Sequence, residues 1–359
     1  MEPVSYTHLD VYKRQDMNAL LLTEYLHLEL TPMPEPSIGP DDVLVKVKAC
    51  GICGSDVHGF DGSTGRRIPP LVMGHEASGV VAQAGHAVTD LSVGERVTFD
   101  STIYCGHCFY CAAGQVNLCD NREVLGVSPG TYRRHGAFAE FVSVPRRIVY
   151  RLPDSIGFEQ AALIEAVSVA VHAVGLIPVR QGETAVVVGS GMIGLLAIQA
   201  ARLAGCTSVV AIDIDEGRLH LARQLGATET VNSRSVNPSE AVREWTSGRG
   251  AGVVVECLGA AETVRTAIAC ARKGGMVALV GNLAAAVELP LQDVVTRQIR
   301  LQGSCASSGE YPAVIELMAT GAIRVDPLIS AVAPLAEGAE WFQRLYRREP
   351  GLMKVILRP

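Results

Sequence analysis

Hydrophobic and polar positions alternate in two different ways along the chain, and the change falls near residue 168. Before it, short runs rich in β-branched residues are broken by Gly and Pro, which predicts a small β-rich domain with irregular loops. After it, fully apolar runs alternate with helical stretches, a pattern typical of right-handed βαβ units on a buried parallel sheet. The predicted fold class is therefore α/β, a β-rich domain beside a doubly wound parallel sheet.

The same pattern places individual elements. In the first part we expect strand-like segments at 17–30, 43–47, 78–82, 96–99 and 138–144. In the second part we expect strands at 184–188, 208–212, 253–256 and 276–280, with helices at 192–203, 216–225, 240–246 and 262–271. The tail after about residue 304 predicts helices at 311–319 and 336–346 and a strand at 354–357. We expect this tail to return and pack on the first domain.

Residues 1–16 do not fit the pattern that begins at Met17. Residues 10–15, D-V-Y-K-R-Q, can be back-translated as GAT GTG TAT AAG AGA CAG, which matches a transposon end used as a sequencing-library adapter. We interpret residues 1–16 as an adapter-derived or disordered tail and exclude them from fold reasoning. A natural N-terminal tail is the alternative.

Composition excludes several classes of function. The net charge is −6 and no basic tract occurs, so nucleic acid is not an expected partner. No apolar run approaches the roughly 18 residues that a membrane helix needs, and no signal core is present, so we expect a cytoplasmic protein without a membrane partner. In a reducing cytosol, the ten cysteines favour metal binding or free thiols over disulfides.

A glycine-rich turn follows the predicted strand 184–188: Gly189-Ser190-Gly191-Met192-Ile193-Gly194. In this position between strand and helix, Gly189 permits a tight turn, Gly191 lets the backbone approach a pyrophosphate, and Gly194 allows close packing. Asp213 ends the next strand, where a carboxylate binds ribose hydroxyls and repels a 2′-phosphate. This favours NAD over NADP. A turn without a ligand is the alternative, and Arg218 either covers the adenosine or is a solvated helix residue.

The spacing Cys105-x-x-Cys108-x-x-Cys111-x7-Cys119 predicts a zinc site. Four thiolates close the tetrahedral shell and leave no open position, so this zinc should be structural. Disulfides at such spacing are the alternative. His107 lies inside the loop, and we expect it to be solvated because four cysteines already suffice.

A second group of candidate ligands lies in C-G-I-C-G-S-D-V-H (50–58) and G-H-E (74–76). A thiolate, an imidazole and a carboxylate there can supply three ligands and leave one position open for water or substrate. Spacing alone leaves the alternatives of a buried cysteine and a hydrogen-bonded core histidine.

Residues 17–359 resemble the zinc-containing medium-chain dehydrogenase family, most closely its polyol, sorbitol-type and threonine dehydrogenase branch. The resemblance rests on the two segments just quoted, the four-cysteine loop, G-S-G-M-I-G and the strand-end acid, in family order. It implies a GroES-like catalytic domain formed by residues 17–167 and 302–359, and a Rossmann NAD-binding domain at 168–301. Relatives form dimers or tetramers, so we expect a homodimer or homotetramer.

Carried over residue by residue, the resemblance makes Cys53 and His75 ligands of a catalytic zinc. Glu76 and Glu165 are both candidates for the next ligand, and which of them is bound stays open. The family usually has Glu-Pro where this chain has Glu165-Ala166. Asp56 resembles the acid that orients the zinc-bound histidine. Cys50 is not carried over, and we expect a buried thiol there.

The resemblance also implies a proton relay from Ser55 through the nicotinamide ribose to His58; a plain surface histidine is the alternative for His58. Zinc lowers the pKa of bound water strongly, to about 7, and a bound alcohol should respond likewise. The resemblance implies further cofactor contacts at Met192, Ile193, Val280, Gly281, Asn282, Ser304, Cys305 and Lys354. Of these, Lys354 is implied as a cation near the phosphates. His172 is expected to be a packed core residue.

The predicted function is hydride transfer from a secondary alcohol to NAD. A non-catalytic NAD-binding zinc protein, a zinc-free quinone reductase and a dehydrogenase specific for L-threonine or a diol are the alternatives. The low aromatic content, 5%, favours a small polar substrate such as a polyol, a sugar alcohol or its phosphate. Arg66 and Arg67 offer charges for a phosphate, but we expect these loop side chains to be solvated.

Overall fold

The computed structural model describes residues 16–359. The segment interpreted as a tail, residues 1–16, therefore lies outside the described residues except for Asp16. That residue opens the first strand, one position earlier than the hydrophobic pattern predicts.

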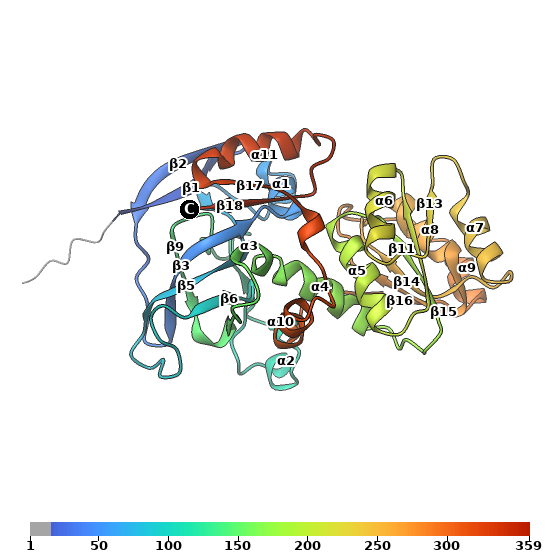
Figure 1. The fold of residues 1–359 in the computed structure, drawn as a ribbon, viewed down its shortest axis with the longest axis horizontal. Coiled ribbons are helices and arrows are strands. Elements are labelled where there is room, and N and C mark those ends of the chain that lie inside the picture. The colour runs from blue at the N-terminus through green and yellow to red at the C-terminus, as the bar shows by residue number, and fades with distance from the viewer. Residues whose placement is uncertain (1–15) are drawn as a thin grey trace, which may run out of the picture.

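Strands from both ends of the chain build the first lobe, on the left in Figure 1. Its main sheet has the order β10-β6-β5-β3-β18-β17, with β9 also paired to β3, and smaller sheets β2-β1-β4 and β7-β8 flank it. The strands are β1 (Asp16–Glu24), β2 (His27–Pro34), β3 (Asp42–Gly51), β4 (Leu71–Val72), β5 (Glu76–Ala84), β6 (Arg96–Phe99), β7 (Thr102–Ile103), β8 (Glu123–Val124), β9 (Phe141–Pro145), β10 (Val149–Arg151), β17 (Ile329–Pro334) and β18 (Lys354–Arg358).

Short helices connect these strands: α1 (Gly54–Phe60), α2 (Phe109–Ala112), α3 (Phe158–Ala161), α11 (Gly338–Tyr346) and the 3₁₀ turns η1 (Val116–Leu118), η2 (Arg146–Ile148), η3 (Asp326–Leu328) and η4 (Leu335–Glu337). Because β18 pairs with β3, the C-terminal residues return to the first lobe.

The continuous pattern at 17–30 is a hairpin rather than one strand. β1 pairs antiparallel with β2, and the chain reverses at Tyr25 and Leu26. Leu26 has φ 64°, a left-handed conformation that glycine or asparagine usually supplies in tight turns. The sequence therefore carries no turn signal at this point.

The second lobe holds a six-stranded sheet in which every pairing is parallel, in the order β13-β12-β11-β14-β15-β16. This order confirms the doubly wound prediction. Its elements are β11 (Thr184–Val188), α5 (Met192–Leu203), β12 (Ser208–Asp213), α6 (Glu216–Gln224), β13 (Glu229–Asn232), α7 (Pro238–Trp245), β14 (Ala251–Glu256), α8 (Ala261–Cys270), β15 (Ala271–Leu279), α9 (Leu291–Thr296) and β16 (Arg300–Gly303).

Three elements of this lobe were not predicted: β13, α9 and β16. Each is short and partly exposed, so none has the apolar run that reveals the central strands. Both β13 and β16 are edge strands of the sheet. An edge strand buries less surface, and its sequence needs fewer apolar residues.

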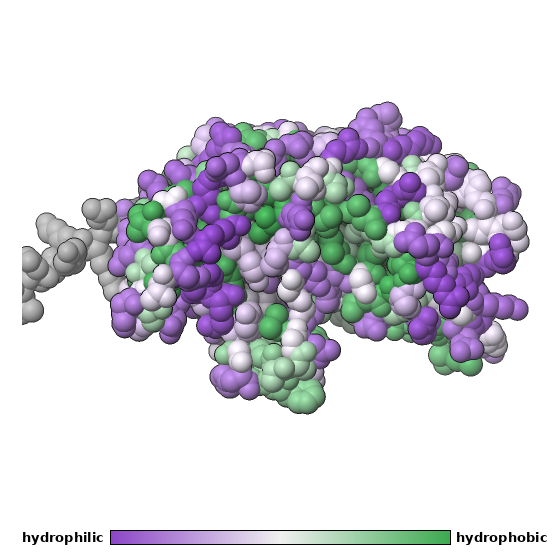
Figure 2. Space-filling view, turned by 60° about the horizontal axis from the view of Figure 1, so that its bottom comes forward, coloured by the Kyte–Doolittle hydropathy of each residue, from purple (hydrophilic) through white to green (hydrophobic). Residues whose placement is uncertain are grey.

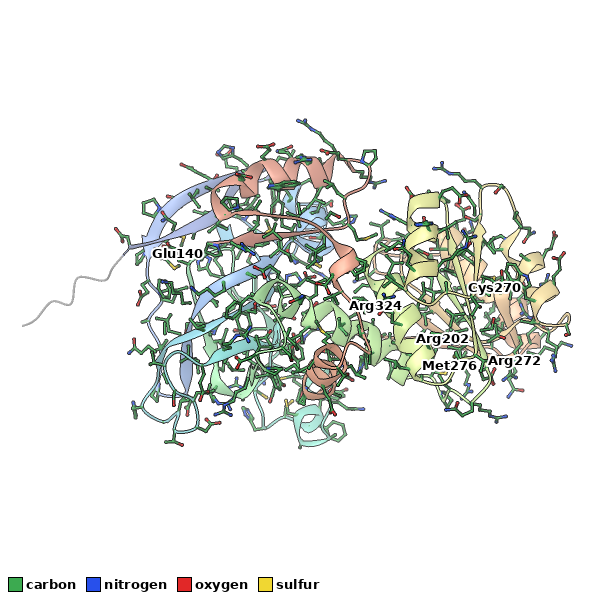
Figure 3. The ribbon with its side chains drawn as sticks, in the orientation of Figure 1. Glu140, Arg202, Cys270, Arg272, Met276 and Arg324 are labelled. Atoms are coloured by element: carbon green, nitrogen blue, oxygen red, sulfur yellow. The ribbon has the colours of Figure 1, made fainter. Side chains whose placement is uncertain are left out.

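Helices α4 (Ile164–Gly175) and α10 (Tyr311–Ala319) lie where the two lobes meet (Figure 1). The predicted domain boundaries fall inside α4 and β16, so continuous elements carry the chain between lobes. Gln199 on α5 clamps the backbone of Arg324, which Figure 3 labels near this junction: its amide donates to the carbonyl at 3.0 Å and accepts from the N–H at 2.8 Å. The division into two domains stays a prediction.

Among residues 16–359, no helix is both long and apolar enough to cross a membrane. The loop that carries α2 projects from the first lobe, and Figure 2 shows a projection at the bottom that is largely pale to green. Phe109 and Leu118 in this loop are 76% and 44% exposed.

Candidate active site

Two strand ends bring the first group of predicted ligands together. Cys53 caps the start of α1 just after β3, and His75 immediately precedes β5. Gly51 on β3 pairs with Glu76 on β5, which sets the two segments side by side. The ligand atoms of Cys53, His75 and Glu76 all lie within 4.8 Å of one another. One sulfur, one nitrogen and one oxygen at this spacing fit a zinc ion with an open position.

Asp56 lies next to both Cys53 and His75. Its Oδ1 lies 3.3 Å from His75 Nδ1, and its Oδ2 accepts the Cys53 N–H at 3.3 Å. Burial of this fully enclosed carboxyl opposes ionisation, but His75 and Arg67 beside it outweigh that effect and lower the pKa to about 2. An ionised acid at this place can orient the imidazole, as the resemblance implies.

Lys354 forms a buried ion pair with Glu76. Its Nζ lies 2.5 Å from Glu76 Oε2 and donates to the Ile52 carbonyl at 3.1 Å, and its side chain is 2% exposed. The cation is thus enclosed in the first lobe and neutralises an acid of the candidate metal site. The contact of Lys354 with the cofactor phosphates stays a prediction, and in this structure the charge of Lys354 is paired with Glu76.

Gly51 makes room for this ion pair. A Cβ at Gly51 would lie 2.5 Å from Glu76 Oε2 and 3.4 Å from Lys354 Cδ. The central strand β3 therefore has no side chain where the pair crosses it.

We expect Gly51→Ala to lower the free energy of unfolding by about 3 kcal/mol, because it overpacks a buried position and displaces one partner of a buried ion pair. Urea unfolding measures the change. Gly54→Ala is the matched control, since a Cβ there meets nothing within 4 Å. Equal stability of the two variants would contradict the role assigned to Gly51.

Glu165 lies in the first turn of α4 and accepts a hydrogen bond from Ser101 Oγ at 3.2 Å. Burial is the main reason why its pKa is raised, and Glu76 nearby adds to the effect. Glu165 is not part of the group within 4.8 Å that contains Glu76. Glu76 thus lies in the group with Cys53 and His75, and the choice between Glu76 and Glu165 as the zinc ligand stays a prediction.

Ser55 and His58 both lie on α1, beside the candidate metal position. Ser55 Oγ donates to Cys53 Sγ at 3.3 Å. His58 is exposed one helical turn further on, and no hydrogen bond joins it to Ser55 in the described part of the chain. A relay between them would need a bridging hydroxyl, which is the role implied for the ribose. Cys50 is fully buried, and burial raises the pKa of its thiol, as expected for a residue that is not a ligand.

Arg67 is buried, although the sequence predicted a solvated loop side chain. It is 5% exposed, and its Nη2 lies 3.0 Å from Asp56 Oδ1 and 3.1 Å from Ser55 Oγ. Only Arg66 is exposed as expected.

The four-cysteine loop has the geometry of a closed metal site. Cys105 Sγ and Cys111 Sγ are 4.0 Å apart, and Cys108 Sγ and Cys119 Sγ are 3.9 Å apart. A tetrahedral zinc with Zn–S bonds of about 2.3 Å separates its sulfurs by about 3.8 Å, so the four residues fit this ion. His107 is outside the group.

The glycine turn has the predicted conformation. Gly189 has φ +93°, and a Cβ at Gly194 would lie 1.8 Å from the Gly189 carbonyl oxygen. A Cβ at Gly191 would meet nothing within 4 Å, so this backbone faces open space at the N-terminus of α5. Helix N–H groups facing an open cradle fit a pyrophosphate. Met192 and Ile193 are half-buried at the start of the helix.

Asp213 ends β12 and is 7% exposed. Its Oδ2 accepts the Ser190 N–H at 2.6 Å, and its Oδ1 accepts the N–H groups of Ile214 and Asp215 at 2.7 and 3.0 Å. The carboxylate is therefore fixed beside the glycine turn. Arg218 is exposed in the first turn of α6.

The other predicted cofactor residues follow strands of the same sheet. Val280, Gly281 and Asn282 follow β15, and Ser304 and Cys305 follow β16. In parallel strands these carboxyl ends share one edge, which is where doubly wound folds bind ligands. Lys354 alone lies in the other lobe.

His172 is not a simple core residue. Its Nδ1 lies 2.6 Å from Glu310 Oε1, and its Nε2 lies 3.4 Å from Asn117 Nδ2. Asn117 also donates to the Cys305 carbonyl at 2.8 Å. This polar network links the four-cysteine loop to the segment after β16.

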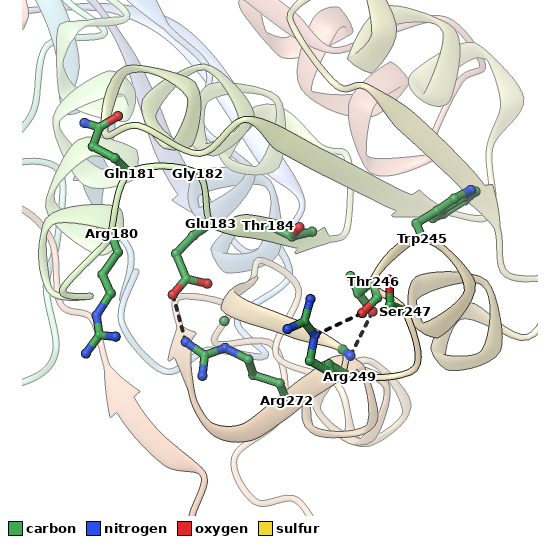
Figure 4. A pocket seen from close by; sticks show the side chains of 12 residues that line it. Arg180, Gln181, Gly182, Glu183, Thr184, Trp245, Thr246, Ser247, Arg249 and Arg272 are labelled. Carbon is green, nitrogen blue, oxygen red and sulfur yellow. Dashed lines mark hydrogen bonds and ion pairs between the residues drawn. The ribbon is translucent and has the colours of Figure 1, made fainter.

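A cavity of about 450 Å³ lies at the opposite end of the parallel sheet, and Arg180, Glu183, Trp245, Arg249 and Arg272 are among its lining residues (Figure 4). It surrounds the starts of β11 and β14. None of the predicted site residues lines it, so it is separate from the candidate active site.

Sequence reasoning missed three groups near the site: the Arg67 guanidinium, the Glu76–Lys354 pair and the Asn117–His172 contact. Each joins residues from distant segments and has no spacing of its own. For the burial of Arg67, the sequence offers one sign, the glycine at position 59. A Cβ added there would lie 2.6 Å from Arg67 Cγ.

Comparisons with known proteins agree with this geometry. Residues 39–154 match the alcohol dehydrogenase GroES-like domain and residues 193–320 match the zinc-binding dehydrogenase family. The chain is 32% identical to sorbitol dehydrogenase of Bacillus subtilis (96% of this chain, 98% of that protein) and 35% identical to D-xylulose reductase A of Aspergillus niger (94% and 96%). A solved structure from Sinorhizobium meliloti 1021, assigned as a zinc-binding dehydrogenase and bound to NADP, is 36% identical with a TM-score of 0.88 (96% and 100%).

Proposed function

Because this chain belongs to the zinc-containing medium-chain polyol dehydrogenase family, we infer that it is an enzyme that transfers a hydride from a polyol or related secondary alcohol to a nicotinamide cofactor. The observation that carries this function is the group Cys53, His75 and Glu76, with the Ser55 hydroxyl 3.3 Å from the sulfur. That group has the ligands of an open zinc site and a proton-transferring hydroxyl next to it.

Zinc bound by Cys53 and His75 would supply a Lewis acid for the substrate oxygen. Asp56 Oδ1 lies 3.3 Å from His75 Nδ1, where it can orient the ring, and the Ser55 hydroxyl can accept and donate a proton beside the substrate oxygen. His58 is exposed on the same helix and could release a proton to water; a bound cofactor would have to supply the hydroxyl that links it to Ser55. Retention of both Ser55 and His58 argues against a non-catalytic NAD-binding protein.

We propose NAD rather than NADP as the cofactor. Relatives include a protein bound to NADP, so the choice rests on this chain's own Asp213. Its carboxylate is fixed by three backbone N–H groups at the end of β12, where it would repel a 2′-phosphate.

A structural zinc in the four-cysteine loop, a homodimer or homotetramer, and a cytoplasmic location belong to the same proposal. Sulfur distances of 3.9 and 4.0 Å support the zinc. Leu291 and Val295 on α9, 66% and 67% exposed, support an oligomer. All ten cysteines are free, which suits a reducing compartment.

Glu76 and Glu165 differ in whether a cation neutralises them, and this difference predicts different effects of substitution on stability. One oxygen of Glu76 is paired with Lys354, whereas Glu165 has no cationic partner within ion-pair distance in residues 16–359. We expect Glu76→Gln to leave Lys354 buried without its counter-charge and to destabilise the fold by about 3 kcal/mol. Glu165→Gln should leave stability within about 1 kcal/mol, since it removes an acid whose charge is already disfavoured by burial. Thermal unfolding measures the stability of both variants. A larger loss of stability with Glu165→Gln than with Glu76→Gln would contradict the role of Glu76 as the counter-charge of Lys354.

The function is tested by the absorbance of reduced nicotinamide with a panel of polyols, sugar alcohols, L-threonine and diols. Turnover with polyols is the expected result. Turnover with L-threonine or one diol alone would narrow the proposal to that substrate class. No turnover with any alcohol, in protein that contains zinc, would favour a non-catalytic NAD-binding role, and protein without zinc would favour a quinone reductase.

A further inference from the structure

One arginine is enclosed in a segment that is otherwise mostly exposed. Residues 62–66 have no buried side chain, yet Arg67 is 5% exposed beneath α1. A guanidinium carries only donors and is always charged, so its burial requires acceptors on the partner residues. Those acceptors identify what the arginine does.

A single nitrogen of Arg67 serves two residues of the candidate site. Nη2 donates to Asp56 Oδ1 at 3.0 Å and to Ser55 Oγ at 3.1 Å. The same Asp56 oxygen lies 3.3 Å from His75 Nδ1. The guanidinium thus holds both the acid behind the histidine ligand and the hydroxyl beside the cysteine ligand.

Donation from Arg67 decides the direction of the Ser55 hydroxyl. Because Arg67 can only donate, Ser55 Oγ must accept from it, and the single hydroxyl hydrogen is left to point elsewhere. In the structure that hydrogen is directed to Cys53 Sγ at 3.3 Å, which is the metal side of the residue. Without Arg67, the hydroxyl of this exposed residue would turn freely in solvent.

The surrounding fold is shaped around this side chain. A Cβ at Gly59 would lie 2.6 Å from Arg67 Cγ and 3.1 Å from its Cδ, so the helix has no side chain where the arginine stem passes. Arg67 also forms a β-bridge with Ser128, whose N–H donates to the Arg66 carbonyl at 2.9 Å. A solvated loop residue would need neither feature.

We propose that Arg67 is a positioning residue of the active site, which fixes the Ser55 hydroxyl on the side of Cys53 and fixes Asp56 behind His75. This inference rests on the proposed function. It predicts two separable defects when Arg67 is replaced: weaker zinc binding at the site containing Cys53, through Asp56, and slower turnover, through Ser55.

The test compares Arg67→Met with Arg66→Met, a neighbouring arginine that is exposed. Zinc affinity is measured by graded chelator dialysis with metal analysis, and kcat and KM are measured with NAD and the best alcohol. We expect Arg67→Met to bind zinc about 10- to 100-fold more weakly, with a lower kcat and an unchanged KM for NAD, as for loss of a group that orients a ligand. Zinc affinity and kcat within about twofold of Arg66→Met would overturn the proposal.

Arg67→Lys keeps the charge next to Asp56 but not the planar fork, and it decides the question if Arg67→Met does not fold. We expect this variant to keep zinc affinity and to lose about tenfold in kcat. A kcat equal to that of Arg66→Lys would overturn the proposal. A wild-type protein that oxidises no alcohol would contradict the proposed function instead, and the zinc affinities would still test Arg67.

Discussion

Cys53→Ala should reduce kcat/KM by about 10³-fold or more, because zinc held at this site would act as a Lewis acid and lower the pKa of the substrate hydroxyl. Cys53 supplies the only sulfur in the group with His75 and Glu76. Its loss leaves an imidazole and a carboxylate that is already paired with Lys354. We expect the variant to lose the zinc of this site while the four-cysteine site stays filled.

Metal analysis and turnover measure this result together, and Cys50→Ala is the matched control. Cys50 is buried in the same segment, lies outside the ligand group and has a raised pKa because of burial. We expect Cys50→Ala to keep its zinc and most of its activity. A Cys53→Ala protein with full zinc content and wild-type turnover would show that the reaction does not use this site.

Asp213→Asn should change the choice between the two nicotinamide cofactors. The carboxylate is fixed beside the glycine turn by the Ser190, Ile214 and Asp215 N–H groups, so it cannot easily swing away from a 2′-phosphate. Relief of about 3 kcal/mol of like-charge repulsion corresponds to about a 100-fold fall in the ratio of kcat/KM for NAD over NADP. Asn keeps one acceptor but turns an NH2 donor towards the remaining N–H groups, so the variant changes local hydrogen bonding as well as charge.

Asp215→Asn is the control for Asp213, because Asp215 is exposed and caps α6 through the Arg218 N–H at 3.0 Å. Its cofactor ratio should stay at the wild-type value. Steady-state kinetics with both cofactors measure the ratio, and an unchanged ratio in Asp213→Asn would mean that another group selects the cofactor.

Features that depend on neighbouring residues could be predicted from the sequence. The four cysteines sit within one short loop, and the glycine turn lies between a strand and a helix, so spacing alone specifies their geometry. Strand 184–188 and helix 192–203 have their predicted bounds because a fully apolar run and a glycine turn mark them sharply. The short edge strands β13 and β16 lacked such signals.

Side-chain partners across the fold could not be predicted in this way. Glu76 and Lys354 are 278 positions apart, and only the pairing of β18 with β3 brings them together. The sequence predicted an exposed loop position for Arg67, but α1 covers its side chain. The apolar neighbours of His172 in the sequence predicted a packed core residue, but Glu310, just before α10, contacts its ring.

Local spacing and hydrophobic period were enough to predict the fold class, the candidate metal-binding cysteines and the glycine turn from the sequence. Only the folded structure shows that Glu76 lies in one group with Cys53 and His75, and that Lys354 and Arg67 are the cations paired with the acids around them. The physical reason is that a buried charge needs a partner wherever the fold can supply one, and strand pairing and helix packing, not sequence distance, determine which residue that is.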